Sequence, residues 1–105
     1  MVQLIVTVKT HPGRAADYVA AFRALAPRVR LEEGCMEYDI YHDSRDPRFD
    51  NEVRPDTVVL CEKWAGIEAL QRHTRGSAAL DEFRKQVKDI KLASSYVLLT
   101  PATGG

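Results

Sequence analysis

The sequence predicts an α+β protein of the ferredoxin-like class, in which a split βαβ arrangement forms one four-stranded antiparallel sheet. Alternating apolar residues mark four strand-like segments, and helical spacing marks the segments between them. Their order along the chain is β-α-β-β-α-β, which is the order of this class. The chain has 105 residues, enough for one domain over residues 1–105. We expect a loop insertion at residues 43–56 and a loose tail at residues 102–105.

The first strand and the first helix follow from two different spacings of apolar residues. Alternation of apolar and more polar side chains predicts a strand over residues 2–8. Spacing by three or four positions then predicts an amphipathic helix of about 17 residues. Its apolar stripe contains Tyr18, Phe22, Leu25 and Val29. Pro27 lies inside this stripe and should kink the helix or end it early, and Gly34 suits a left-handed cap that closes it.

The second strand leads into a long connection. Alternation predicts a strand over residues 35–42. One face of this strand is expected to carry Met36, Tyr38, Ile40 and His42. The connection over residues 43–56 is rich in Asp, Arg and Pro. A connection of this length is either a lid or binding loop, or a solvated insertion.

The rest of the chain completes the sheet. A third strand is predicted over residues 57–65, and Glu62 and Trp64 share one of its faces. A short helix then carries His73 on its inner side, and Ser77 is suited to be the N-cap of a further helix. The fourth strand is expected over residues 96–100.

The predicted strands have apolar residues on both faces, whereas one layer of helices covers only one face. The third strand, for example, has Val58 and Leu60 on one face and Val59 and Cys61 on the other. A second copy of the same sheet is the simplest cover for the open face. We therefore expect a homodimer in which the two open sheet faces pack together as a dimeric α+β barrel.

Charge and hydropathy argue against several kinds of partner. The chain has 15 basic and 15 acidic side chains, so no net charge attracts nucleic acid or an anionic membrane. No apolar run reaches the roughly 20 residues that span a bilayer, and no signal-peptide pattern is present. Cys35 and Cys61 form no C-x-x-C motif. We expect a cytoplasmic protein with two reduced thiols.

Five side chains are candidates for chemistry, and each has a structural alternative. Glu62 lies on an apolar strand face, so it needs either an ion-pair partner or a cleft. Trp64 is either a core or interface anchor, or a wall against which a flat aromatic ligand stacks. His73 is either a satisfied histidine at a helix end or a group that binds or deprotonates a substrate hydroxyl. Tyr38 is either a core residue or, together with His42, a polar group inside a mostly apolar pocket.

Motifs for tightly bound groups are missing from the sequence. His11, His42 and His73 show no metal-ligand spacing. The glycine-rich motifs that bind dinucleotides or nucleotide phosphates do not occur. We therefore expect no metal site and no tightly bound organic cofactor.

A series of short motifs runs through the chain in a defined order. They are Lys9-Thr10-His11-Pro12-Gly13, Glu32-Glu33-Gly34-Cys35 followed by Tyr38, Pro55-Asp56-Thr57, Glu62-x-Trp64, Ala69-Leu70 and His73. Together they resemble the antibiotic biosynthesis monooxygenase family of small dimeric α+β-barrel proteins, and especially its quinol monooxygenase-like members. The resemblance extends from Val2 to about Pro101.

The chain departs from the family pattern in two places. Family members often carry a second histidine-containing step just after the one matched by His73, and here Arg75-Gly76-Ser77 stands instead. The haem-degrading branch needs an asparagine on the first strand and a haem-ligating histidine on the last helix. This chain has neither, so haem degradation is not expected.

The resemblance implies a monooxygenase that oxidises a small phenolic or hydroquinone substrate with O2 and without a metal or flavin. In that reading His73 takes or hydrogen-bonds the hydroxyl proton, and Glu62 orients His73 or the substrate. The substrate ring is lined by Trp64 and Tyr38, with His42 and Phe22 completing the substrate-binding set. Two alternatives remain: a non-redox enzyme of the isomerase type on the same fold, or a non-enzymatic dimeric module that binds a small molecule or acts in a stress response.

Overall fold

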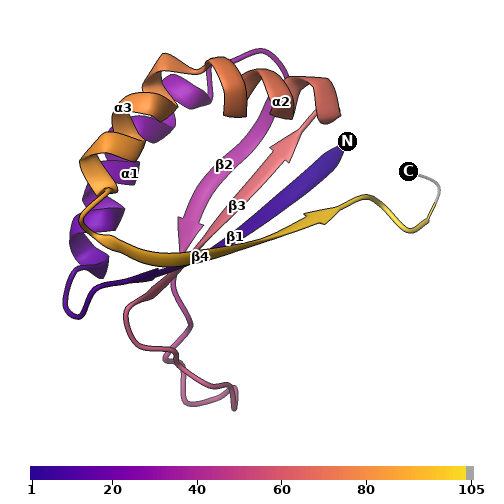
Figure 1. Ribbon diagram of the computed structural model, residues 1–105. Helices are drawn as coiled ribbons and strands as arrows, with labels where there is room; N and C mark the ends of the chain where they lie inside the picture. The colour runs from indigo at the N-terminus through magenta and orange to yellow at the C-terminus, as the bar shows by residue number, and fades with distance from the viewer. Residues whose placement is uncertain (104–105) are drawn as a thin grey trace.

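The sheet has the strand order β2-β3-β1-β4, and neighbouring strands are antiparallel throughout (Figure 1). The computed structural model describes residues 1–103. Its strands are β1 (Val2–Thr10), β2 (Cys35–Tyr41), β3 (Thr57–Trp64) and β4 (Lys91–Leu99). Its helices, α1 (Ala15–Val29), α2 (Ile67–Gly76) and α3 (Ala78–Val87), cover one face of the sheet. This arrangement confirms the predicted ferredoxin-like class.

The core lies between the helices and one face of the sheet. Rows of paired residues cross this helix-facing side, and one row joins Tyr38, Glu62, Leu4 and Leu98. In β3 the alternation is complete, because Val58, Leu60, Glu62 and Trp64 are all buried. Ser77 caps α3 by accepting a hydrogen bond from the Leu80 backbone N–H at 3.2 Å, as predicted.

The fourth strand is longer than the sequence pattern predicts. It begins at Lys91 instead of residue 96, and its early part, which includes Ser94 and Ser95, pairs with β1. Almost all of its side chains are exposed, so burial imposes no alternation there. Backbone hydrogen bonds to β1 hold this part of the strand, and side-chain patterns do not report such bonds. The expected tail begins after this strand, and residues 104–105 of it lie outside the described residues.

The end of the first helix differs from the expected cap. Helix α1 continues through Pro27 and ends two residues later at Val29. Gly34 has a left-handed φ of 83°, but it lies in the turn before β2, whereas the helix cap is Arg30 in a right-handed conformation. A Cβ atom on Gly34 would lie 2.5 Å from the Cβ of Ala69 in α2. Glycine is therefore required here both by φ and by the close approach of α2.

A bulge changes the faces of the second strand. The pairing with β3 shifts between Cys35 and Glu37, so Met36 is 62% exposed. The expectation that Met36 shares the buried face of Tyr38 is therefore wrong. Beyond the bulge the alternation resumes, with Tyr38 buried and Ile40 partly buried.

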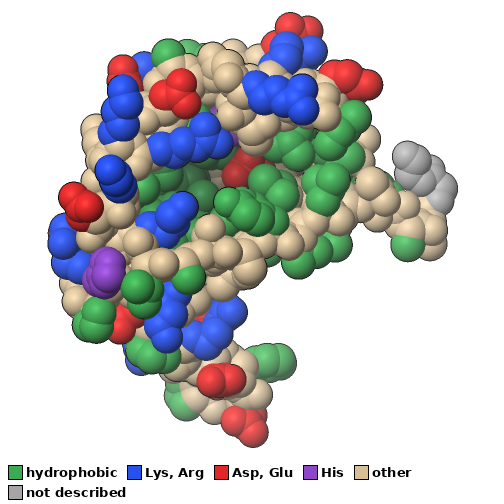
Figure 2. Space-filling view, in the orientation of Figure 1, with side chains coloured by type: hydrophobic (Ala, Val, Ile, Leu, Met, Phe, Trp, Pro, Cys, Tyr) green, Lys and Arg blue, Asp and Glu red, His purple; other side chains and the backbone are tan. Residues whose placement is uncertain are grey.

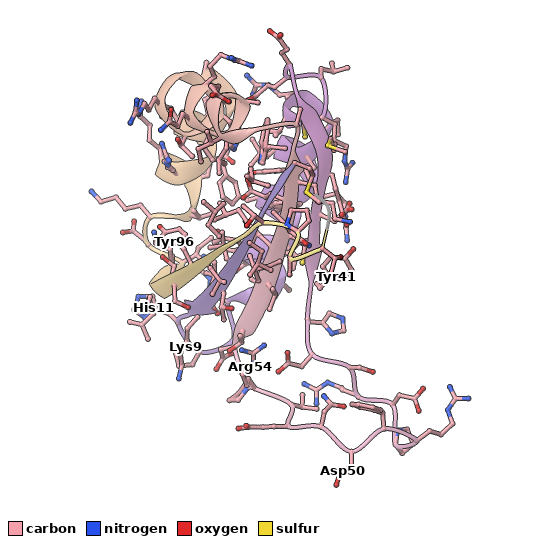
Figure 3. The ribbon with its side chains drawn as sticks, turned by 90° about the vertical axis from the view of Figure 1, so that its right-hand side faces the viewer. Lys9, His11, Tyr41, Asp50, Arg54 and Tyr96 are labelled. Carbon is pink, nitrogen blue, oxygen red and sulfur yellow. The ribbon has the colours of Figure 1, made fainter. Side chains whose placement is uncertain are left out.

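Residues 43–56 form a loop that projects away from the sheet, with Asp50 at its far end (Figure 3). The base of the loop is closed by Asp43 and Arg54. The Nε and Nη2 groups of Arg54 each donate a hydrogen bond to the Asp43 carboxylate at 2.8 Å. The Arg54 backbone N–H also donates to this carboxylate, at 2.9 Å. These hydrogen bonds lower the pKa of Asp43. Within residues 1–103, no helix has the length and apolar character needed to cross a membrane.

Candidate functional site

A cavity of about 240 Å³ lies between the helix-facing side of the sheet and the helices. Figure 2 shows it as a hollow between the helices and β4, with acidic atoms inside and basic side chains near its rim. Its walls are mostly apolar. The polar residues that line it are Tyr18, Tyr38, Glu62, His73, Thr74, Arg84, Lys88, Lys91, Ser94 and Tyr96. A small cavity whose wall surface is mostly apolar and that also carries polar groups is the ordinary form of a small-molecule site.

Glu62 contributes a carboxyl group that is nearly removed from water. The residue is 4% exposed and sits in the middle of the sheet, between Tyr38 on β2 and Leu4 on β1. Burial raises the pKa of Glu62 to about 7, although the Trp64 indole N–H donates to its Oε1 at 3.1 Å and lowers it. Both the acid and the carboxylate form are therefore populated near neutral pH, which suits proton transfer.

His73 is held in a fixed orientation by Glu32. Its Nδ1 lies 2.8 Å from the Glu32 Oε1, and the Ser77 hydroxyl donates to the Glu32 Oε2 at 2.6 Å. A carboxylate only accepts hydrogen bonds, so Nδ1 carries the proton and Nε2 of the neutral ring keeps its lone pair. Burial lowers the pKa of His73, and the Glu32 carboxylate opposes that change. A neutral imidazole with a free Nε2 is suited to accept a proton.

Two tyrosines face the same cavity with their hydroxyl groups. Tyr18 is 3% exposed and Tyr38 is 1% exposed. Burial raises the pKa of both phenols well above the ordinary value, so both remain hydrogen-bond donors at neutral pH. Within residues 1–103 neither hydroxyl has a hydrogen-bond partner. Every fully buried side-chain polar atom in this range does have a partner, so the two hydroxyls are not fully buried. The two hydroxyls are therefore open to the cavity that both residues line.

The structure brings Tyr38, Glu62 and His73 together at this cavity. Trp64 and Phe22 lie behind these residues and do not line it. Trp64 is fully buried, with its ring centroid 4.7 Å from that of His73. Phe22 stacks against Tyr38, with ring centroids 5.0 Å apart and an interplanar angle of 11°. Trp64 and Phe22 thus support the rings that face the cavity, and the buried position of Trp64 matches its core alternative.

His42 and Glu32 show what the sequence pattern misses. His42 follows the last residue of β2 and lines a separate groove, formed by α1 and the 43–56 loop. Glu32, which was not a candidate, contacts His73 in the way that was expected of Glu62. It lies in the Glu32-Glu33-Gly34-Cys35 motif, but 41 positions separate it from His73. A contact across that distance leaves no periodic signal in the sequence.

The part of the chain that the structure describes contains no candidate metal site. Among the residues that the structure describes, no three or more His, Cys, Asp or Glu side chains are grouped so that they could hold a metal ion. The buried polar groups that line the cavity are a carboxyl, a neutral imidazole and two phenol donors. This set can bind an aromatic hydroxyl compound and exchange protons with it.

Comparison with known proteins gives a family and a fold. The family model of the antibiotic biosynthesis monooxygenases (ABM) matches residues 1–89. Probable quinol monooxygenase YgiN of Escherichia coli K12 is 26% identical over 103 residues, which cover 96% of this chain and 98% of YgiN.

Solved structures have the same fold. PA3566 from Pseudomonas aeruginosa superposes with a TM-score of 0.79 at 24% identity, covering 97% of this chain and 94% of that protein. Rv0793 from Mycobacterium tuberculosis superposes with a TM-score of 0.76 at 26% identity, covering 95% of this chain and 94% of that protein. The agreement extends over nearly the whole chain, so the sheet and helices that build the cavity belong to the shared fold.

Proposed function

The chain belongs to the antibiotic biosynthesis monooxygenase family, and we propose that it is a cofactor-independent monooxygenase that oxidises a small phenolic or hydroquinone substrate with O2. One observation carries the proposal: Tyr38, Glu62 and His73 meet in one small, mostly apolar cavity. The name of the relative YgiN, a probable quinol monooxygenase, supports the substrate class. Trp64 and Phe22 act from behind, because they pack against His73 and Tyr38, whereas His42 lines a separate groove and has no part in the proposal.

The first step is removal of a hydroxyl proton from the substrate. His73 accepts this proton at Nε2, because Glu32 holds the other nitrogen in its protonated state. The Tyr38 hydroxyl remains protonated and donates a hydrogen bond to the phenolate oxygen. The apolar walls exclude water, so these few donors and acceptors determine the charge distribution around the ring.

Oxygen then reacts with the electron-rich ring. The phenolate transfers one electron to O2, and the two radicals combine to form a peroxide anion at a ring carbon. The proton held by His73 converts this anion to a hydroperoxide. The Glu62 carboxylate removes the proton from that carbon while the O–O bond breaks, which leaves a carbonyl on the ring and a hydroxide ion. The hydroxide takes the proton from Glu62 and leaves as water, which restores the carboxylate. Overall, a hydroquinone and O2 give a hydroxylated quinone and water, and all four electrons come from the substrate.

Oxygen uptake tests the proposal. Protein dialysed against a chelator is mixed with 1,4-hydroquinone or 1,4-naphthohydroquinone in an oxygen electrode, and the product is analysed after reaction under ¹⁸O2. We expect one labelled oxygen atom in the quinone and one in water. Hydrogen–deuterium exchange of the substrate without oxygen uptake would instead indicate a non-redox enzyme of the isomerase type. Binding of the hydroquinone without hydrogen–deuterium exchange or oxygen uptake would indicate a non-enzymatic binding module.

We also propose that two copies pack through the open face of the sheet. That face carries an apolar row of Cys61, Ile5 and Val97, and Val97 is 54% exposed. Partly buried Val59 and the exposed Tyr41 lie beside this row. Light scattering at micromolar concentration should give about twice the chain mass of 11.8 kDa, and Ile5→Asp should reduce it to one chain. A single-chain mass for the unmodified protein would refute the dimer.

The free thiols of Cys35 and Cys61 fit a reducing compartment, which is consistent with the cytoplasmic location that we expect.

A further inference from the structure

The charges that line the cavity are unevenly distributed. The acidic group, Glu62, is buried in the middle of the sheet. The basic groups are Arg84, Lys88 and Lys91, which come from the end of α3 and the start of β4 and are exposed at the rim. Figure 2 shows this pattern, with acidic atoms inside the hollow and basic side chains around it. A ligand in the cavity therefore meets a carboxyl group at its inner end and positive charge at its outer end.

The three basic side chains are not equivalent. Arg84 already donates to the Thr74 carbonyl at 3.2 Å and to the Asp81 carboxylate at 3.4 Å. Within residues 1–103, Lys88 and Lys91 have neither an ion pair nor a side-chain hydrogen bond. Lys88 stands at the C-terminal end of α3, where a cation is favourable without any ligand. Lys91 begins a strand and has no such reason to be basic.

We propose that the cavity takes hydroquinones that carry an anionic substituent, such as a carboxylate, and that Lys88 and Lys91 bind this substituent at the rim. This substrate class rests on the proposed function. An ammonium beside a carboxylate forms a charge-assisted hydrogen bond, which is stronger than a bond between neutral groups. The orientation follows as well, because the Glu62 carboxylate repels an anion from the inner end. The hydroxyl groups of the ring are thereby directed to Tyr38 and His73.

The experiment compares two probes that differ in charge and by one methyl group: 2,5-dihydroxyphenylacetate and its methyl ester. Binding is measured by calorimetry without oxygen, so that no turnover is needed. The wild type should bind the acid at least about 10-fold more tightly than the ester. The preference should weaken when salt is raised from about 20 mM to about 500 mM, because these lysines are exposed.

Variants assign the effect to the two lysines. Lys88→Gln/Lys91→Gln should bind acid and ester equally, whereas Lys85→Gln should keep the wild-type preference. Lys85 is the matched control, because it is an exposed lysine on α3 that does not line the cavity. Equal binding of both probes by the wild type, or an unchanged preference in the double variant, would overturn the inference. Its failure is distinct from that of the proposed function, since the first is read from anaerobic binding and the second from oxygen uptake.

Discussion

The Nδ1 atom of His73 lies 2.8 Å from the Oε1 atom of Glu32, although 41 positions separate the two residues in the sequence. The contact joins the turn before β2 to α2, and the Ser77 hydroxyl extends it to the start of α3. It determines which nitrogen of His73 carries the proton, so that Nε2 keeps the lone pair. The protonation state of the candidate base is therefore controlled by a residue outside the cavity.

Replacement of Glu32 by glutamine should lower both the pKa of His73 and the rate. The carboxylate raises that pKa, so its removal leaves the lowering effect of burial unopposed. We expect kcat to fall by at least about 10-fold, since the imidazolium formed on proton transfer loses its stabilising charge. NMR titration of the His73 ring and oxygen uptake measure the two effects. Glu33→Gln is the control, because Glu33 is exposed, and an unchanged His73 titration in Glu32→Gln would refute the contact.

His73→Ala should lower kcat by about 100-fold or more, which is the usual contribution of a general base. The ring is 3% exposed and packs on Trp64, so thermal unfolding must show that the variant remains folded. His11→Ala is the matched control, since His11 is exposed and lies outside the cavity. A rate of oxygen uptake in His73→Ala equal to that of the wild type would remove His73 from the mechanism.

Glu62 should make the stability of the protein fall as pH rises. Its pKa changes from 4.5 in the unfolded chain to about 7 in the fold, so the folded state binds this proton more tightly. The resulting stabilisation is fully present below pH 4.5 and is lost as pH rises through 7. Between pH 4.5 and about pH 8, the wild type should lose roughly 3 kcal/mol relative to Glu62→Gln, which does not titrate. Urea unfolding of both proteins measures this difference, and parallel pH profiles would contradict it.

Trp64→Phe should act on Glu62 and leave substrate binding nearly unchanged. The indole N–H lowers the pKa of Glu62 through its hydrogen bond, so its loss raises that pKa further. The pH at which Glu62 becomes the active carboxylate should therefore move upward. The pH dependence of kcat should show this shift with KM nearly constant, because Trp64 does not line the cavity. A large increase in KM with an unchanged pH profile would instead support direct stacking of the substrate on Trp64.

Gly34→Ala should destabilise the protein more than Gly13→Ala. Both glycines have left-handed φ angles, 83° and 75°, so both substitutions carry backbone strain. Only at Gly34 would the new Cβ also meet Ala69 of α2, at 2.5 Å. We expect a loss of about 2–4 kcal/mol for Gly34→Ala and about 1 kcal/mol for Gly13→Ala. Denaturant unfolding gives both values, and equal losses would mean that α2 moves away at little cost.

The sequence pattern predicts the element order and most of the buried faces. Alternation identifies β3 with Glu62 and Trp64 on the helix-facing side, and helical spacing identifies the apolar stripe of α1. It fails at Met36, where a bulge interrupts the alternation, and over the first half of β4, where exposure removes it. Periodicity reports burial, so it misses both a bulged residue such as Met36, which is left out of the pairing, and exposed strand residues that backbone pairing alone holds in place.

By itself the sequence determined the sheet, the helices that cover it and the polar residues on their inner faces, because each depends on the spacing of near neighbours. The tertiary structure alone decided how those polar residues are combined. Glu62 and His73 line one cavity, and Glu32 is the hydrogen-bond partner of His73. His42 lines a separate groove. These relationships depend on how the helices and the 43–56 loop pack around the sheet, and packing joins residues far apart in the chain without leaving a local pattern.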